Sequence, residues 1–289
     1  MTITTQSSQP GQPTLAQSLS AALAETQLRL INISRYPGQL ALEIVIPIIF
    51  AAMPMLLGRA TGGEDAAANF AANTGTANYV AYLLIGSNVF SLVSNAFWHI
   101  AYWLRFEQET GTLEAVYLTP TSTLTLASGV ALYSIIRGLS SSLLAYVIGC
   151  LIFQVNPFQG NVLLALGFIA VGLLPLYGMA LLFGAVVLKV KESNAVVNLM
   201  QWVVSFLMGI FFPVTVLPPF VRVIAWLFPP TWMTNGVRSA LLGVGYFFGE
   251  WYADMAVLWA FMLVAPLFGF WVFQRTERSI QRNEGVGQF

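Results

Sequence analysis

Six apolar runs, each long enough to cross a lipid bilayer, constrain this sequence more than any other feature. They lie near residues 38–57, 78–101, 123–153, 161–187, 195–217 and 251–273. A hydrocarbon core about 30 Å thick needs roughly 20 apolar residues in a helix. Because 57% of the residues are hydrophobic and only 8% are charged, we expect an all-α integral membrane protein with six transmembrane helices.

The chain before the first run divides into two parts. Residues 1–14 have neither the basic start nor the apolar core of a signal peptide, and they are predicted to be a disordered tail. Residues 15–289 then form one membrane domain. In residues 15–36 the apolar side chains, Leu15, Leu19, Leu23, Leu30 and Ile31, fall near one face. This predicts an interfacial amphipathic helix that turns into the membrane at Pro37, with an ordinary soluble helix as the alternative.

The basic residues predict the orientation, because cytoplasmic loops of membrane proteins carry an excess of Lys and Arg. If both termini are cytoplasmic, only Arg59, Arg222 and Arg238 lie outside. The basic residues on the cytoplasmic side are then Arg29, Arg35, Arg105, Lys189, Lys191, Arg275, Arg278 and Arg282. We therefore expect a multi-pass protein with both ends in the cytoplasm.

The segment between the fifth and sixth runs, residues 212–243, is too apolar for a free loop and contains several prolines. Pro218, Pro219, Pro229 and Pro230 delimit two short helices, near 219–228 and 231–242. Irregular backbone at membrane depth persists only when it is buried against protein or lines a cavity. We expect a re-entrant helix pair on the extracellular side.

No motif in the sequence indicates an enzyme. There is one histidine, one cysteine and no Gly-rich phosphate loop, so neither a metal site nor a nucleotide site is predicted in this chain. The formal net charge is zero and no basic block occurs, which gives no sign of a nucleic-acid partner. If ATP and Mg²⁺ drive this protein, another chain binds them.

Polar side chains recur at helical spacing in the second and fifth runs. The set in the second run is Asn88, Ser91, Asn95 and His99, and the set in the fifth is Asn194, Asn198, Gln201 and Ser205. Offsets of three and four place each set on one helix face, and such groups are costly in lipid. Two interpretations fit: both faces line a polar path, or they form hydrogen bonds that hold the bundle or a dimer together.

Three charged residues fall within the apolar runs. Arg137 lies in the third run, and a buried guanidinium requires a partner. Glu43 in the first run is the candidate, and we expect a buried charge pair of structural importance. Asp254, near the outer end of the last run, is expected to reach water.

Charge is concentrated in one further place, RFEQETGTLEAVYLTP, residues 105–120, which contains Glu107, Glu109 and Glu114. This stretch resembles the cytoplasmic loop of the type-2 ATP-binding cassette permeases, the membrane subunits of a large class of exporters. FFPVTVLPPFVRVIAWLFPPTWMTNGVRSALLG is similar to the extracellular re-entrant segment of that family, with its Phe-Pro opening, Leu-Pro, second proline pair and late Arg. The resemblance covers the chain from about residue 15.

The resemblance implies a mechanism and a set of site residues. A short helix in the acidic loop would dock into a separate cytoplasmic ATPase, through the coupling residues Glu107, Glu109, Gly111, Thr112 and Glu114. Two permeases would form a dimer with a central path lined by Asn88, Asn95, His99, Asn198, Gln201 and Ser205. The outer gate would contain Phe212, Pro213, Phe220 and Trp226, for which packing alone is the other interpretation.

The expected function is that of a permease subunit of an ATP-driven exporter in a bacterial inner membrane. It would act as a dimer with two ATPase subunits and move an amphipathic drug, lipid, glycolipid or lipid-linked glycan. A secondary transporter driven by an ion gradient is the alternative, although Glu43 stands nearly alone as a midplane acid. A membrane-embedded transferase would need metal-binding carboxylate pairs.

Overall fold

The computed structural model describes residues 14–62, 66–101, 103, 106–107, 110–111, 121–190 and 193–283, and every regular element in these ranges is helical. The elements are α1 (Leu15–Ser34), α2 (Pro37–Gly62), α3 (Ala66–Thr74), α4 (Tyr79–Ala96), the π-helical η2 (Phe97–Ala101), α7 (Thr123–Phe153), α8 (Val162–Val187), α9 (Ser193–Leu207), the 3₁₀ turn η3 (Val214–Val216), α10 (Pro219–Trp226), α11 (Pro229–Leu242) and α12 (Trp251–Asn283). The prediction of an all-helical protein is confirmed for these residues.

Five of the described helices are long and apolar enough to cross a membrane. They are α2, α4 with the start of η2, α7, α8 and α12, and they correspond to five of the six predicted runs. Three of them start at a side-chain cap: Asn78, Ser122 and Asn161 each accept from the backbone N–H three residues later. These caps satisfy one of the backbone donors that a helix start leaves unpaired.

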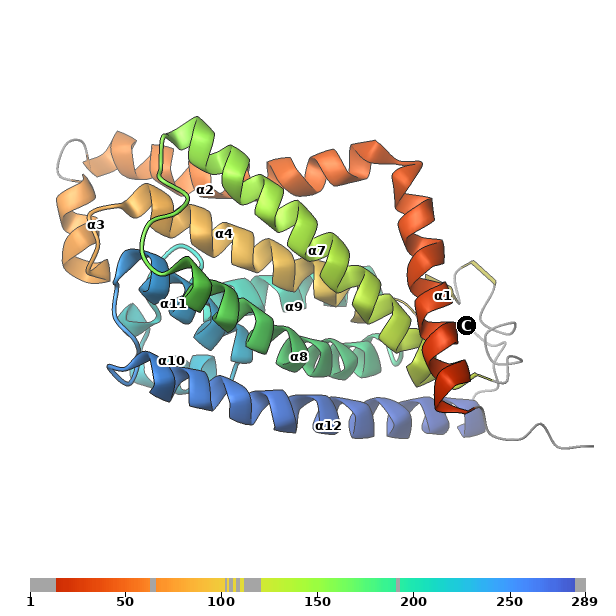
Figure 1. Cartoon of the computed structure of the whole chain (residues 1–289). Helices are drawn as coiled ribbons and strands as arrows, with labels where there is room; N and C mark the ends of the chain where they lie inside the picture. Colours follow the sequence, from red (N-terminus) through yellow and green to blue (C-terminus); the bar gives the residue numbers. More distant parts are fainter. Residues whose placement is uncertain are drawn as a thin grey trace, which may run out of the picture.

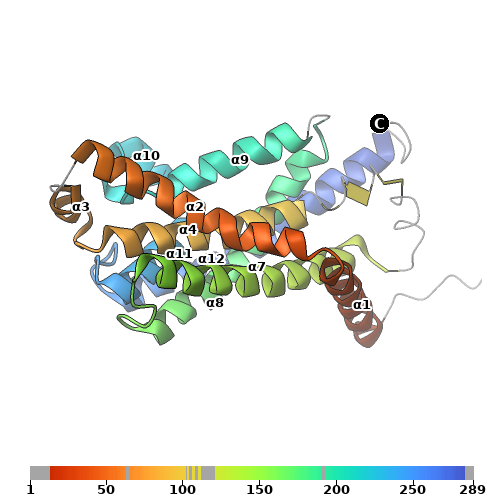
Figure 2. The ribbon, with the colours of Figure 1, turned by 90° about the horizontal axis from the view of Figure 1, so that it is seen from above.

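The fifth predicted run differs from the prediction, because residues 195–217 do not form one continuous helix. The helix α9 ends at Leu207, and Gly209 then adopts a left-handed backbone with φ of 62°. Pro213 and Pro218 follow and lack the N–H that a helix would need. At 1.5 Å per residue, a 15-residue helix is about 22 Å long, shorter than the hydrocarbon core. α9 nevertheless runs back along the bundle, at its edge, toward the end that holds α10 (Figure 2).

Two short helices follow, as the prolines predicted. α10 and α11 each begin with proline in the first turn. α11 is buried along nearly its whole length and packs against α8, α4 and α12. The end of α12 and the helix α1 lie at one end of the bundle, and α3, α10 and α11 lie at the other (Figure 1).

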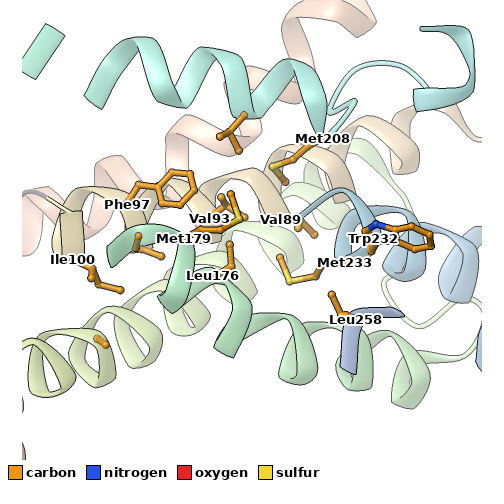
Figure 3. Packing of buried hydrophobic residues seen from close by; sticks show 14 of the residues in the cluster. Val89, Val93, Phe97, Ile100, Leu176, Met179, Met208, Trp232, Met233 and Leu258 are labelled. Atoms are coloured by element: carbon orange, nitrogen blue, oxygen red, sulfur yellow. The ribbon is translucent and has the colours of Figure 1, made fainter. Parts of the chain in front are cut away.

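The hydrophobic core lies between α4, α8, α11 and α12 (Figure 3). The helices α8 and α12 pack closely against each other, and a Cβ on Gly178 would lie 2.2 Å from the backbone of Ala265. A Cβ on Gly269 would lie 2.1 Å from the carbonyl oxygen of Gly178. Small residues therefore allow the two backbones to touch, as is common between membrane helices.

The helix α1 crosses the end of the bundle at a steep angle to the long helices (Figure 1). Thr14, the last residue of the predicted tail, caps α1 through a capping box with Gln17. Residues 1–13 lie outside the described residues. The Thr26 hydroxyl donates to the carbonyl of Gly129 at 2.9 Å and ties α1 to α7. Leu15, Leu19 and Leu23, from the predicted apolar face, remain exposed.

Candidate functional site

A groove with a volume of about 320 Å³ lies between α2 and α4. We refer to it as the α2/α4 groove. Its polar lining comes from Glu43, Ser87, Ser91, Ser94, Asn95 and His99. Its aromatic lining comes from Phe50, Phe90 and Trp98. The groove can therefore bind a molecule by hydrogen bonding and by contact with aromatic rings.

The residues of the predicted polar face of α4 line two different cavities. Ser91, Asn95 and His99 line the groove, and the Asn95 Nδ2 donates to the carbonyl of Ser91 at 3.1 Å. Asn88 lines a separate apolar cavity between α4, α7, α8 and α11, and its predicted place on the path stays a prediction. The groove is centred on the neighbouring serine face of α4, which leaves Asn88 beyond its edge.

The sequence also contains a second polar stripe that the spacing analysis did not use. Ser87, Ser91, Ser94 and Trp98 stand at offsets of four, three and four and all line the groove. Serine is common on membrane helices because its hydroxyl donates to the preceding turn, so the stripe is a weak signal without a structure.

The predicted charge pair lies at one end of the groove. The structure brings Arg137 against Glu43 in a two-pronged ion pair, in which the Arg137 Nε donates to Glu43 Oε2 at 3.1 Å and Nη2 contacts Oε1. Arg137 Nη1 also donates to the Tyr133 hydroxyl at 2.5 Å. Two charges buried in the bundle are therefore paired and hydrogen-bonded, as their burial requires.

This ion pair stands between two cavities. Glu43 lines the α2/α4 groove, whereas Arg137 lines a neighbouring cavity of about 380 Å³ near α1. Trp98 and His99 line both. His99 lies in the π-helical turn η2 and packs edge-on against Tyr133, with ring centroids 5.2 Å apart. π-helical turns inside helices occur frequently at functional sites.

The polar face of α9 is exposed at Asn194 and Asn198, half-buried at Gln201 and buried at Ser205. Gln201 joins it to α4, because its Nε2 donates to the Ser94 hydroxyl at 2.7 Å. Asn198 is exposed and donates to the carbonyl of Asn194 in its own helix at 2.9 Å. Ser205 is buried and donates to the carbonyl of Trp202. The structure thus brings one of the three predicted α9 path residues into contact with α4.

Phe50 links the groove to α9. Its ring stacks with Phe90 of α4, Trp202 of α9 and Phe211 beyond α9, with ring centroids 6.2, 6.4 and 6.3 Å apart. Sequence spacing could not identify Phe50, because residues 44–57 around it in α2 are all apolar and leave no polar face as a reference. Aromatic rings at such distances interact through offset stacking.

The four predicted outer-gate residues do not form one cluster. Phe212 packs edge-on against Phe206, with ring centroids 5.5 Å apart, whereas Trp226 is tilted against Phe247 at 6.2 Å. Phe220 is exposed, and Pro213 is half-buried at the start of η3.

Two charged residues at this end of the bundle are buried, and for Asp254 this contradicts the sequence-based expectation. Arg238 of α11 is 2% exposed and donates to the carbonyls of Tyr82, Gly209 and Ile210 at 3.2, 2.8 and 2.6 Å. It therefore satisfies the backbone that unwinds after α9. Asp254, expected to reach water, is fully buried and accepts from the backbone N–H groups of Phe247 and Phe248.

At the opposite end, Glu107 contacts α1. Its Oε1 accepts from Arg29 Nη2 at 3.2 Å and from Trp103 Nε1 at 3.1 Å, and its side chain is 16% exposed. The predicted contact of Glu107 with an ATPase stays a prediction. Gly111 is exposed with φ of 74°, a conformation that suits a tight turn. Glu109, Thr112 and Glu114 lie outside the described residues.

The arrangement provides hydrogen-bonding and aromatic groups that can bind a molecule. In the part of the chain that the structure describes, no three His, Cys, Asp or Glu side chains are grouped to hold a metal ion. The family model of the ABC-2 type transporter matches residues 22–242, from within α1 to the end of α11. The chain belongs to the ABC-2 type transporter family. The protein is thus a multi-pass ABC transporter permease, and a search of curated proteins found no match to it.

Proposed function

We propose that this permease is the membrane subunit of an ATP-driven exporter for an amphipathic molecule. The observation that carries the proposal is the α2/α4 groove, which combines amide and hydroxyl groups with Phe50, Phe90 and Trp98. Its one carboxylate, Glu43, is already paired with Arg137. A groove with hydrogen-bonding groups, aromatic rings and little unpaired charge suits a drug, lipid, glycolipid or lipid-linked glycan.

The groove would become a path when a second protomer covers it. α9 supports this part of the proposal, because Trp202 is 62% exposed beside Asn198 and Leu199. In a dimer these side chains would border a central path together with Asn95, His99 and Gln201. α9 and the turn after it would make the sixth crossing, and α10 and α11 would close the outer mouth.

The energy would come from two separate ATPase subunits that bind ATP and Mg²⁺ on the cytoplasmic side of a bacterial inner membrane. Glu109, Thr112 and Glu114 would contact them directly. Glu107 would act inside the permease, because its contact with Arg29 ties the acidic loop to α1. Closure of the ATPases would then tilt α1 and the helices packed on it as units.

The test is reconstitution of the permease with a coexpressed nucleotide-binding subunit in phospholipid vesicles. ATP should move NBD-labelled phosphatidylethanolamine between leaflets, as read by dithionite quenching, and the permease without its partner should not hydrolyse ATP. Transport without the ATPase, driven by an imposed proton or sodium gradient, would show instead an ion-coupled carrier.

A charge reversal tests the coupling loop within the same assay. Glu114→Lys should reduce copurification of the ATPase and coupled hydrolysis by about tenfold or more, since loss of one partner of a buried charge pair costs about 2–5 kcal/mol. Glu250→Lys is the matched control, because Glu250 is exposed just before α12 at the end of the bundle opposite α1 (Figure 1). Equal ATPase recovery with both variants would contradict the docking role.

A further inference from the structure

A second cavity, of about 340 Å³, lies on the side of α4 away from the α2/α4 groove. We call it the lateral cavity. α7 and α8 are consecutive in the chain, yet α7 packs mainly on α1 and α4 while α8 packs mainly on α12 and α11. The cavity lies between these two helices, with Val89 of α4 and Val237 of α11 also in its wall.

The mouth of the lateral cavity opens where the protein faces lipid. Leu143 of α7 and Leu166 of α8 line it and are 61% and 52% exposed. Both helices are long and apolar enough to cross a membrane, so the medium outside is hydrocarbon. Water is disfavoured in an apolar cavity, and an empty one loses dispersion contacts. The apolar chain of a membrane amphiphile is therefore the occupant that this surface fits.

One polar atom in the wall lacks a partner. Asn88 is 4% exposed, and its Nδ2 donates to the carbonyl of Leu84 at 2.8 Å, which fixes which side of the amide is oxygen. The Oδ1 has no hydrogen-bond partner among the described residues. A buried acceptor without a donor is uncommon and calls for a ligand or water to complete it.

The other polar groups of the wall have their donors engaged. The Ser142 hydroxyl donates to the backbone carbonyl of Asn88 at 3.2 Å. The Tyr146 hydroxyl donates to the carbonyl of Pro157 at 3.5 Å. Neither of these hydrogen bonds reaches the Asn88 Oδ1, so an occupant that satisfies it must supply the hydrogen itself.

We propose that the lateral cavity binds an acyl chain that carries a hydroxyl group, with the hydroxyl donating to Asn88 Oδ1. The site is separate from the path, because its walls are α4, α7, α8 and α11, whereas the groove lies between α2 and α4. The proposal does not depend on the direction of transport or on the ATPase. The chain could belong to a resident lipid or to a transported amphiphile, and both present the same chemistry to Asn88.

The test uses two photoactivatable C16 fatty acids that carry the same diazirine, one with a mid-chain hydroxyl and one without. The permease is labelled in phospholipid nanodiscs, and the crosslinked peptides are identified by mass spectrometry. The hydroxylated probe should label residues 139–147 and 162–169 about fivefold more than the plain probe, as one net hydrogen bond of about 1 kcal/mol implies. Labelling that is equal for both probes, or confined to other helices, would overturn the proposal.

Two variants separate the hydroxyl contact from the cavity itself. Asn88→Leu should retain labelling by the plain probe and abolish the preference for the hydroxylated one. Leu166→Trp should reduce labelling by both probes, because the indole occupies the mouth, whereas Leu163→Trp, at an 81% exposed position on the same helix outside the cavity, should not. A preference that survives in Asn88→Leu, or equal labelling of the two tryptophan variants, would contradict the site.

Labelling of the complex with its ATPase shows whether the bound acyl chain belongs to a resident lipid or to a transported molecule. Labelling that persists during ATP turnover indicates a resident lipid, and labelling that falls during turnover indicates a transported molecule. Either result supports the site, because both require an occupied lateral cavity.

Discussion

α4 and α9 carry nearly the same spacing of polar residues, yet the fold treats the two helices differently. On α4, Asn88, Ser91 and Asn95 are all buried, whereas on α9 Asn194 and Asn198 are exposed. α4 is enclosed by α2, α7 and α11, while α9 makes only sparse contacts with the rest of the chain. The same spacing therefore places buried residues on α4 and exposed asparagines on α9.

The difference shows which side chains the protein covers by itself and which it leaves exposed. Apart from the Asn88 Oδ1, the described polar groups of α4 find their partners within one chain, and α4 builds the groove and the wall of the lateral cavity. α9 leaves Trp202, Leu199 and Asn198 uncovered at the edge of the bundle (Figure 2). Amides and large apolar groups on one exposed face suit a protein partner better than lipid alone.

The largest loss of stability is expected when one member of the ion pair beside α4 is removed. Arg137→Leu leaves Glu43 without its partner, and we expect a loss of about 3–5 kcal/mol in stability. The measurement is thermal unfolding of the purified permease followed by size-exclusion fluorescence. The double variant Glu43→Leu, Arg137→Leu should recover most of the loss, and a double variant as unstable as the single one would contradict this account.

A substitution at the contact between α4 and Arg238 should reduce stability by nearly as much. A Cβ on Gly86 would lie 1.9 Å from Arg238 Nη2 and 2.4 Å from the carbonyl oxygen of Ile210. Gly86→Ala should therefore destabilise by about 1–3 kcal/mol through overpacking, although alanine favours a helix by about 1 kcal/mol. Gly167→Ala is the control, since its nearest new neighbour is Met255 Cε at 3.7 Å. A melting temperature that rises in both variants would show that Arg238 moves aside freely.

A matched pair of substitutions compares the two helices directly. Asn95→Leu removes a buried hydrogen bond to Ser91, and we expect a loss of about 1 kcal/mol. Asn198→Leu, on the exposed face of α9, should leave monomer stability unchanged and alter the fraction of dimer measured by light scattering. Equal destabilisation of the monomer by both variants would show that α9 is as enclosed as α4.

The smallest expected effect on stability comes from the one side-chain link between the two polar faces. Gln201→Leu removes the hydrogen bond to Ser94, which is worth about 0.6 kcal/mol in a membrane protein. Substrate-stimulated ATP turnover of the complex should fall by more than this small change implies, if the link holds α9 against the groove. If ATP turnover of the Gln201→Leu variant equals that of the wild type, the contact of Gln201 with Ser94 has only a structural role.

Much of the fold was predictable because membrane length and apolar composition are local properties. Two short helices form between the prolines as predicted, although the second begins at Pro229 and not near 231. Five of the six apolar runs form long helices. The end of α9 was missed because residues 208–217 are apolar enough to continue a span. The left-handed Gly209 and the three carbonyl contacts of Arg238 end that run instead, and these depend on partners 28 or more residues away.

The candidate site was predictable only in part. The sequence named Glu43 and Arg137 as partners because a buried charge needs a counter-charge, and the structure places them together. Spacing grouped Asn88 with Asn95 and His99, whereas in the structure Asn95 and His99 line the α2/α4 groove and Asn88 lines the lateral cavity. A helical period identifies which residues share a face, but the direction of that face depends on the helices that surround it.

By itself, the sequence determined that this chain is a bundle of apolar helices with polar faces on two of them, because hydrophobicity and helical period are carried by neighbouring residues. Only the tertiary structure decided that α4 is enclosed and α9 exposed, that Glu107 contacts α1, and that α7 and α8 diverge around an apolar cavity. These outcomes arise from packing between residues distant in the chain, where the shapes of facing side chains and the space left by glycines decide which helices meet.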